Sequence, residues 1–227
     1  MMFEELEVLP PDESYDGPMQ MALDEVLLRR VSKTTMRIYR WEAPCVSFGY
    51  FQKYTEVRFA HPSSPLVRRW TGGGMVEHGA DLTFSLMVPR EVAFGQYSPA
   101  QFYKILHRAF ASAITRFTKL EIVMAGDREI LTGPSCFSAP ARDDLIWQGN
   151  KILGGAQRRS EGALLYQGSL QGCREISWGM REALLHEQLA SALGNHVRES
   201  ILSETMKQAA LELAHHRYRS DEWNKRR

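Results

Sequence analysis

Apolar residues recur every three or four positions in several stretches of the chain, and this spacing predicts helices with one buried face. Such stretches cover residues 19–30, 99–117, 180–193 and 198–217. Alternating or short apolar runs predict strands at 36–41, 45–50, 65–70, 81–88, 121–124, 144–147, 151–153 and 162–170. Since helices and strands mix without strict alternation, we expect an α+β fold with mixed, largely antiparallel sheets flanked by helices.

A glycine-rich segment, RRWTGGGMVEH, separates two of these strands. It contains Arg69, Thr71, Gly72, Gly73 and Gly74, and it ends at His78. Three glycines cost backbone entropy and are seldom kept unless the chain needs a positive φ or a close approach to a ligand. A bare backbone beside positive charge suits an acidic or acyl-phosphate-bearing ligand. A hairpin turn between strands 65–70 and 81–88 is an equally weighted alternative.

A second glycine-rich segment, GNKILGGAQRR, contains Lys151 followed by Gly154 and Gly155. Its lysine can place an ammonium group over a carbonyl or phosphate oxygen held against bare backbone. On the residues alone, a solvated turn lysine is the favoured interpretation because most lysines are exposed. The chain has neither a P-loop motif nor GxGxxG, which excludes those two nucleotide-binding fingerprints.

Cys136 lies in the loop-like segment GPSCFS. A loop thiol near a lysine can have a lowered pKa, which raises the thiolate fraction that attacks acyl groups. A small apolar filler is the alternative, and spacing alone favours it. We interpret Cys45 as a core residue and find no evident partner for Cys173. The seven histidines form no HxH or HExxH pattern, so we expect no metal site.

The bulk properties of the 227-residue chain are those of an ordinary soluble protein, with 44% hydrophobic and 24% charged residues. A net charge of +1 does not favour a nucleic-acid partner. No apolar run approaches the roughly 20 residues that cross a bilayer, and the acidic N-terminus differs from a secretory signal. Three cysteines make no even disulfide set. We therefore expect a cytoplasmic protein that binds neither nucleic acid nor membrane.

Several motifs together resemble the biotin/lipoate protein ligase superfamily, which includes lipoate–protein ligases and octanoyltransferases. In chain order they are MALDE, RIYRW through Pro44 to SFGYFQ, RRWTGGGMVEH, GNKILGGAQRR and YQGSL. The resemblance covers most of the chain and implies one catalytic domain over 1–227, without the accessory C-terminal domain of many ligases. It also implies a mixed sheet wrapped by helices and an acyl tunnel beneath the first glycine loop.

The resemblance implies transfer of a medium-chain acyl group to a lysine of lipoyl domains, in 2-oxoacid dehydrogenases or the glycine-cleavage H protein. An octanoyltransferase takes a thioester from acyl carrier protein and needs no cofactor, whereas a ligase makes an acyl-adenylate from ATP, normally with Mg²⁺. DLTFS at 81–85, the Cys136-Phe137 pair, and the 15 residues from Cys136 to Lys151 resemble the cysteine-dependent octanoyltransferases. Gly74 and Glu77 depart from that branch, and the GGG form is more ligase-like. A silent binding module is a third hypothesis, disfavoured by the retained Lys151.

The resemblance also implies roles for individual residues. Cys136 would attack the thioester, and Lys151 would lower the pKa of that thiol and orient the acceptor amine. Backbone amides of Gly73, Gly74 and Gly155 would approach the acyl carbonyl. Arg69 and Arg158 would meet the phosphopantetheine phosphate or the acidic carrier surface. The implied substrate-binding set is Arg69, Thr71, Gly72, Gly73, Gly74, His78, Gly154, Gly155, Ala156, Gln157 and Gly168.

Overall fold

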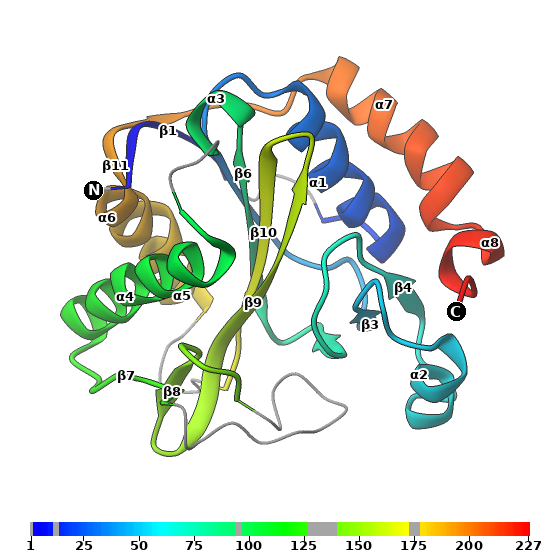
Figure 1. The fold of residues 1–227 in the computed structure, drawn as a ribbon, viewed down its shortest axis with the longest axis horizontal. Helices are drawn as coiled ribbons and strands as arrows, with labels where there is room; N and C mark the ends of the chain where they lie inside the picture. The colour runs from blue at the N-terminus through cyan, green and yellow to red at the C-terminus, as the bar shows by residue number, and fades with distance from the viewer. Residues whose placement is uncertain (1, 11–13, 94–96, 127–139, 173–177) are drawn as a thin grey trace.

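A computed structural model of the chain describes residues 2–10, 14–93, 97–126, 140–172 and 178–227 (Figure 1). Its strands are β1 (Phe3–Leu9), β2 (Thr35–Tyr39), β3 (Cys45–Phe48), β4 (Leu66–Arg68), β5 (Val76–His78), β6 (Leu82–Val88), β7 (Val123–Met124), β8 (Leu145–Trp147), β9 (Asn150–Ser160), β10 (Ala163–Leu170) and β11 (Gly194–Glu199). Its helices are α1 (Gly17–Arg30), α2 (Tyr54–Ala60), α3 (Arg90–Ala93), α4 (Pro99–Thr118), α5 (Trp178–Ala183), α6 (Ala190–Leu193), α7 (Glu204–Leu213) and α8 (Asp221–Asn224). The π-helical segments η2 (Leu184–Leu189) and η3 (Ala214–Tyr218) continue α5 and α7.

Within the described residues the strands form a larger sheet, in the order β11-β1-β2-β6-β10-β9-β8-β7, and a smaller one, β4-β3-β5. Strand β1 runs parallel to β2 and β11, and β3 runs parallel to β4. The other neighbouring strands are antiparallel. Figure 1 shows α4, α5 and α6 on one side of β9 and β10, and α1 and α7 on the other. The predicted α+β fold with mixed, largely antiparallel sheets is therefore confirmed.

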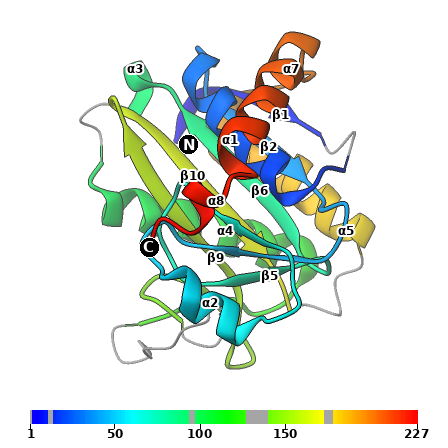
Figure 2. The ribbon, with the colours of Figure 1, turned by 90° about the vertical axis from the view of Figure 1, so that its right-hand side faces the viewer.

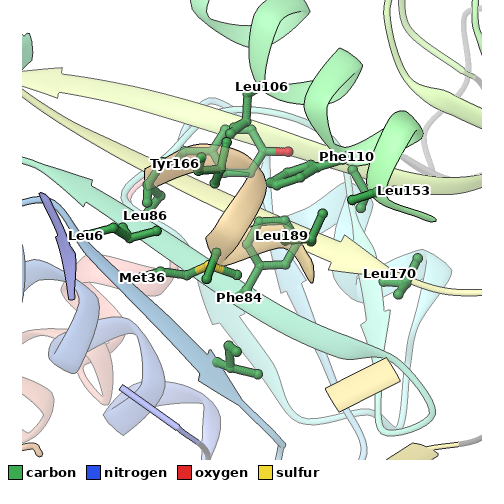
Figure 3. Close-up of a cluster of buried hydrophobic side chains, with 14 of the residues drawn as sticks. Leu6, Met36, Phe84, Leu86, Leu106, Phe110, Leu153, Tyr166, Leu170 and Leu189 are labelled. Carbon is green, nitrogen blue, oxygen red and sulfur yellow. The ribbon is translucent and has the colours of Figure 1, made fainter. Parts of the chain in front are cut away.

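Helix α4 covers one face of the larger sheet and closes the main core. Ser98 caps its N-terminus in a reciprocal capping box with Gln101. Apolar side chains at four-residue spacing face the sheet, where Phe110 meets Phe84 edge-on with ring centroids 5.1 Å apart. Figure 3 shows these rings with Tyr166 in one cluster. Among the helices of the described ranges, α4 included, none is long and apolar enough to span a membrane.

Helix α1 is buried on nearly all sides rather than on one face only. Its outer side lies under α7 and η3, which carry the chain back over it (Figure 2). Two buried carboxylates on α1 are compensated by charge. Asp24 pairs with Arg37 at 2.8 Å, and Glu25 accepts hydrogen bonds from Arg217 and Tyr218. This pairing is what allows charged residues inside the fold.

The strands on either side of the glycine triplet are not neighbours, contrary to our prediction. Strand β4 lies in the smaller sheet and β6 in the larger one. The unpredicted strand β5 follows the triplet, and β3 separates it from β4. The triplet is therefore not a hairpin turn. The pattern was misleading because it cannot show that a distant strand lies between two segments that are close in sequence.

Two further expectations need correction at the strand and helix boundaries, and two more strands were not predicted. The predicted strand 151–153 is the start of the long strand β9, so the second glycine pair lies within a strand rather than in a loop. The predicted helix 198–217 begins only at α7, because residues 194–199 form β11 along the edge of β1. Strands β1 and β11 were missed. Val197 is the only large apolar side chain of β11, so backbone pairing rather than an apolar pattern defines it.

His107, on α4, gives the fold a testable pH dependence. Its ring is fully buried, stacks on Tyr103 with centroids 3.8 Å apart, and lies 2.6 Å from the Tyr166 hydroxyl. Burial lowers the pKa of this imidazole from 6.5 to about 3. Between those values the unfolded chain binds a proton that the native chain does not, so stability falls as the pH falls.

We expect this group to remove about 2 kcal/mol from the free energy of unfolding between pH 7 and pH 5. Urea unfolding at both pH values, compared between the natural chain and His107→Gln, measures the contribution. The variant should lose less stability on acidification than the natural chain. Equal losses in the two proteins would show that His107 is not held neutral.

Candidate active site

The buried guanidinium of Arg69 holds the glycine triplet in place. It donates to the carbonyl oxygens of Gly72 at 3.0 Å and Gly74 at 2.7 Å, and to Oγ of Ser47 at 2.7 Å. Gly73 has a φ of 86°, the left-handed region that favours glycine. These contacts direct the Arg69 guanidinium towards the loop, and its encounter with a carrier phosphate or acidic surface stays a prediction.

The two glycine-rich segments, distant in sequence, meet in space. A Cβ added at Gly73 would lie 3.4 Å from Cβ of Ala156 on β9. Beside this contact, Thr71 donates to the Gln167 side chain on β10 at 2.6 Å. A cavity of about 30 Å³ lies between the segments. Of the predicted residues, it is lined by Arg69, His78, Gly154, Gly155, Ala156 and Gly168.

Lys151 is buried and ion-paired, not a solvated turn lysine. Its Nζ lies 2.7 Å from Oδ2 of Asp144, and the two side chains are 1% and 0% exposed. Asp144 also accepts from the Tyr103 hydroxyl at 2.5 Å and from the backbone N–H of Ala141 at 2.6 Å. A buried pair with these extra hydrogen bonds fixes a positive charge beside the cavity.

Gly154 and Gly155 make room for side chains. A Cβ at Gly154 would fall 2.2 Å from Cε of Lys151, so the lysine stem lies against bare backbone at the cavity wall. A Cβ at Gly155 would fall 2.2 Å from the Tyr166 hydroxyl. The Gly155 N–H donates to the Tyr103 hydroxyl at 3.0 Å. The use of this amide at an acyl carbonyl stays a prediction, and it requires the Gly155 N–H to exchange its hydrogen bond with Tyr103 for one with the ligand.

His78 lies in a hydrogen-bonded row at the other wall of the cavity. Its Nε2 is 2.6 Å from Oγ of Ser47 and its Nδ1 is 2.7 Å from Oδ2 of Asp81. The indole of Trp41 stacks on the imidazole with centroids 3.9 Å apart. Burial alone would raise the pKa of Asp81, but the neighbouring His78 imidazole and the hydrogen bonds to this carboxylate outweigh burial and lower that pKa. The row thus ends in a buried carboxylate.

Two of the other candidates lie away from the cavity, and a third cannot be placed. Gln157 donates to the carbonyl of Pro99 at the start of α4 and does not line the cavity. The half-buried guanidinium of Arg158 stacks over Trp70 at 4.5 Å and donates to its carbonyl oxygen. Cys136, the predicted nucleophile, is outside the described residues.

Sequence reasoning missed most of the cavity's polar wall. The residues overlooked are Met21, Tyr39, Trp41, Ser47, Val76, Thr83, Gln167 and Ser169. One signal was present in the sequence. Ser47, Thr83, Gln167 and Ser169 are polar positions inside strands that are otherwise rich in apolar residues. A buried polar residue in a strand needs a partner, and here the partners surround the cavity.

Gly49 gives the most direct test of the loop geometry. A Cβ at this position would lie 2.0 Å from the carbonyl oxygen of Gly73, a backbone atom that cannot rotate away. Gly49→Ala should therefore displace the triplet and lower the free energy of unfolding by about 1–3 kcal/mol. Gly72→Ala is the matched control, because nothing lies within 4 Å of its added Cβ. Equal thermal midpoints for the two variants would contradict this packing.

Known protein families and individual proteins resemble this chain in sequence. The family model "Lipoyl protein ligase A/B catalytic domain" matches residues 16–196. An octanoyltransferase LipM from Oceanobacillus iheyensis is 35% identical over 164 residues, which cover 68% of this chain and 60% of that protein. The Brevibacillus brevis LipM is 27% identical over 267 residues, covering 95% of this chain and 97% of that protein.

The fold has solved counterparts. A T. acidophilum protein with bound lipoic acid superposes with a TM-score of 0.80 at 22% identity, over 98% of this chain and 99% of that one. At this identity the likeness concerns the fold alone. The family match goes further: it covers most of the chain, so the chain belongs to the lipoyl protein ligase A/B catalytic domain family.

Proposed function

We propose that the protein transfers an octanoyl group from octanoyl-acyl carrier protein to a lysine of a lipoyl domain, through a thioester on Cys136. The observation that carries the proposal is the buried ion pair of Lys151 with Asp144, next to Gly154 of the cavity lining, in a chain whose relatives are octanoyltransferases. A charge fixed in a water-poor site acts more strongly on a reacting group than an exposed lysine does. The acceptors are lipoyl domains of 2-oxoacid dehydrogenases or the glycine-cleavage H protein.

The reaction has two acyl transfers. The Cys136 thiolate attacks the carbonyl of the octanoyl thioester, a new C–S bond forms, and the carrier leaves as its thiol after taking up a proton. The deprotonated acceptor lysine then attacks the enzyme thioester. An amide forms, the bond to Cys136 breaks, and the thiol is restored. The reaction consumes no nucleotide, because the acyl group arrives already activated.

Lys151 serves both steps through its charge. A fixed ammonium group favours the thiolate form of a nearby cysteine and the negative charge that develops on the acyl oxygen. Asp144 holds the ammonium group in one place, and Gly154 leaves space for the lysine stem.

A second function is an ATP-dependent lipoate–protein ligase that acts through a lipoyl-adenylate, with Mg²⁺. The GGG form of the first loop favours it, because Gly74 stands where octanoyltransferases often carry arginine. In this case Lys151 contacts the adenylate and Cys136 is structural.

Intact-protein mass spectrometry tests the covalent route. After incubation with octanoyl-acyl carrier protein, the enzyme should carry one octanoyl group that hydroxylamine removes, and peptide mapping should place it on Cys136. Cys136→Ser should lose transfer. Unaltered transfer by this variant would contradict the thioester mechanism.

A further inference from the structure

The row Ser47–His78–Asp81 has the arrangement of a nucleophile, a base and an orienting acid. Ser47 Oγ to His78 Nε2 is 2.6 Å, and His78 Nδ1 to Asp81 Oδ2 is 2.7 Å. These distances are within the hydrogen-bonding range that defines an activated hydroxyl nucleophile. The three residues come from β3, from the end of β5 and from the turn before β6, so the fold, not a local motif, assembles them.

The surrounding hydrogen bonds determine which ring nitrogen of His78 carries the proton. Asp81 accepts from the hydroxyls of Thr83 and Ser169, at 2.8 and 2.6 Å, and from the N–H of Gly79 at 3.1 Å. These donors keep the carboxylate ionised, and because an ionised carboxylate only accepts, His78 Nδ1–H donates a hydrogen bond to it. Nε2 is then the acceptor nitrogen, and the hydroxyl of Ser47 donates to it.

Two neighbours complete the arrangement. Trp41 stacks on the imidazole at 3.9 Å and is itself fixed by a hydrogen bond from its indole N–H to Thr83 at 2.8 Å. The Arg69 guanidinium donates to Ser47 Oγ at 2.7 Å, which favours negative charge on that oxygen. Ser47 and His78 line the cavity together, so a ligand in the cavity lies against a serine that is otherwise buried.

We propose that Ser47, His78 and Asp81 form a catalytic triad that hydrolyses acyl esters and thioesters bound in the cavity. Ser47 Oγ attacks the acyl carbonyl carbon while His78 Nε2 takes the hydroxyl proton. The bond to the alcohol or thiol breaks, and that leaving group takes the proton from His78. A water molecule then attacks the serine ester with the same proton transfers. The products are the free carboxylic acid and the restored serine.

This activity is distinct from the transfer reaction, because neither Cys136 nor Lys151 takes part in it. The expected substrates are short and medium-chain acyl esters, since the cavity walls combine apolar side chains with the polar row. Water competes with the acceptor lysine for the acyl group, so the triad releases acyl chains that are not passed on.

The test uses the full chain with Cys136→Ala, so that thiol chemistry cannot contribute. Hydrolysis of p-nitrophenyl octanoate is followed by absorbance, and a fluorophosphonate probe is used to find the reactive hydroxyl by peptide mass spectrometry. We expect measurable hydrolysis and a single adduct on Ser47. Adding Ser47→Ala should lower the hydrolysis rate at least about 100-fold, and Asp81→Asn should lower it strongly by disturbing the imidazole tautomer.

Ser85→Ala is the matched control. Ser85 is also fully buried in a strand, but it donates to Asp24 and does not line the cavity. Its variant should hydrolyse the ester at the parent rate. Because the probe is applied to a protein that retains Ser47, the outcome does not depend on how the serine variants fold. Absent hydrolysis, an adduct elsewhere, or full activity in Ser47→Ala would overturn the triad and leave the transfer reaction untouched.

Discussion

Replacing Lys151 by methionine should reduce octanoyl transfer at least about 100-fold, the scale expected when a charge that stabilises a transition state is removed. The ammonium group is buried beside the cavity, so no solvent cation takes its place. Methionine keeps the length and flexibility of the stem that lies against Gly154. The loss should therefore appear in kcat and not only in KM.

The transfer rate is measured as octanoylated lipoyl domain formed from octanoyl-acyl carrier protein. Lys104→Met on α4 is the control, because that lysine is exposed and its loss should leave the rate unchanged. Lys151→Arg restores the charge but not the shape, and we expect only partial recovery. If Lys151→Met transferred octanoyl groups as fast as the natural chain, Lys151 would have no part in the mechanism.

Replacing Asp144 by asparagine should lower the free energy of unfolding by about 3–5 kcal/mol, the usual cost of removing one member of a buried ion pair. The substitution keeps the size of the side chain and removes the charge that compensates Lys151. Chemical denaturation measures the change. The same variant should also transfer more slowly, because the ammonium group is no longer held in one position.

A control variant and a double variant test whether the effect comes from the ion pair of Asp144 with Lys151. Asp143→Asn makes the same change one residue earlier, at a partly exposed site with a φ of 68° that asparagine tolerates. Its stability should change by less than about 0.5 kcal/mol. The double variant Asp144→Asn, Lys151→Met should regain part of the stability but none of the activity, since the uncompensated charge is gone. Additive losses would show that the two side chains are not coupled.

Periodicity predicted the elements that carry a strong apolar pattern. Helix α4 begins and ends within one residue of the prediction, because its four-residue spacing, its cap and its first-turn proline agree. Strands β2, β3, β6 and β10 were found for the same reason. Strand β11 was not, since its residues are mostly exposed and only the backbone of β1 specifies it.

The site was predicted where a motif had a local signature and missed where contacts are long-range. The two glycine segments were singled out from the sequence, whereas Lys151 was a candidate only through the family resemblance, since the residues alone favoured a solvated lysine. The partner of Lys151, the carboxylate of Asp144, was not recognised, because nothing in the pattern indicates which acid is buried with it. Ser47 and His78 lie 31 residues apart and meet only because β3 and β5 pair.

The charge of a residue type also did not predict whether its side chain lies at the surface. Arg69 was expected at a partner's acidic surface, and in the structure it braces the glycine triplet from inside. A guanidinium can be buried when carbonyl oxygens and a hydroxyl occupy its donors, and the folded loop supplies them. The family resemblance pointed to Arg69, and the structure places this residue in the cavity lining, while its role towards a carrier stays a prediction.

The most direct test of the central claim offers the enzyme two acyl donors side by side. One reaction contains octanoyl-acyl carrier protein and no ATP, and the other contains free octanoate with ATP and Mg²⁺. Each contains the same lipoyl domain, and its octanoylation is measured by mass spectrometry. We predict octanoylated lipoyl domain in the first reaction and none in the second. Product only with ATP and free octanoate would contradict the transferase and establish the ligase.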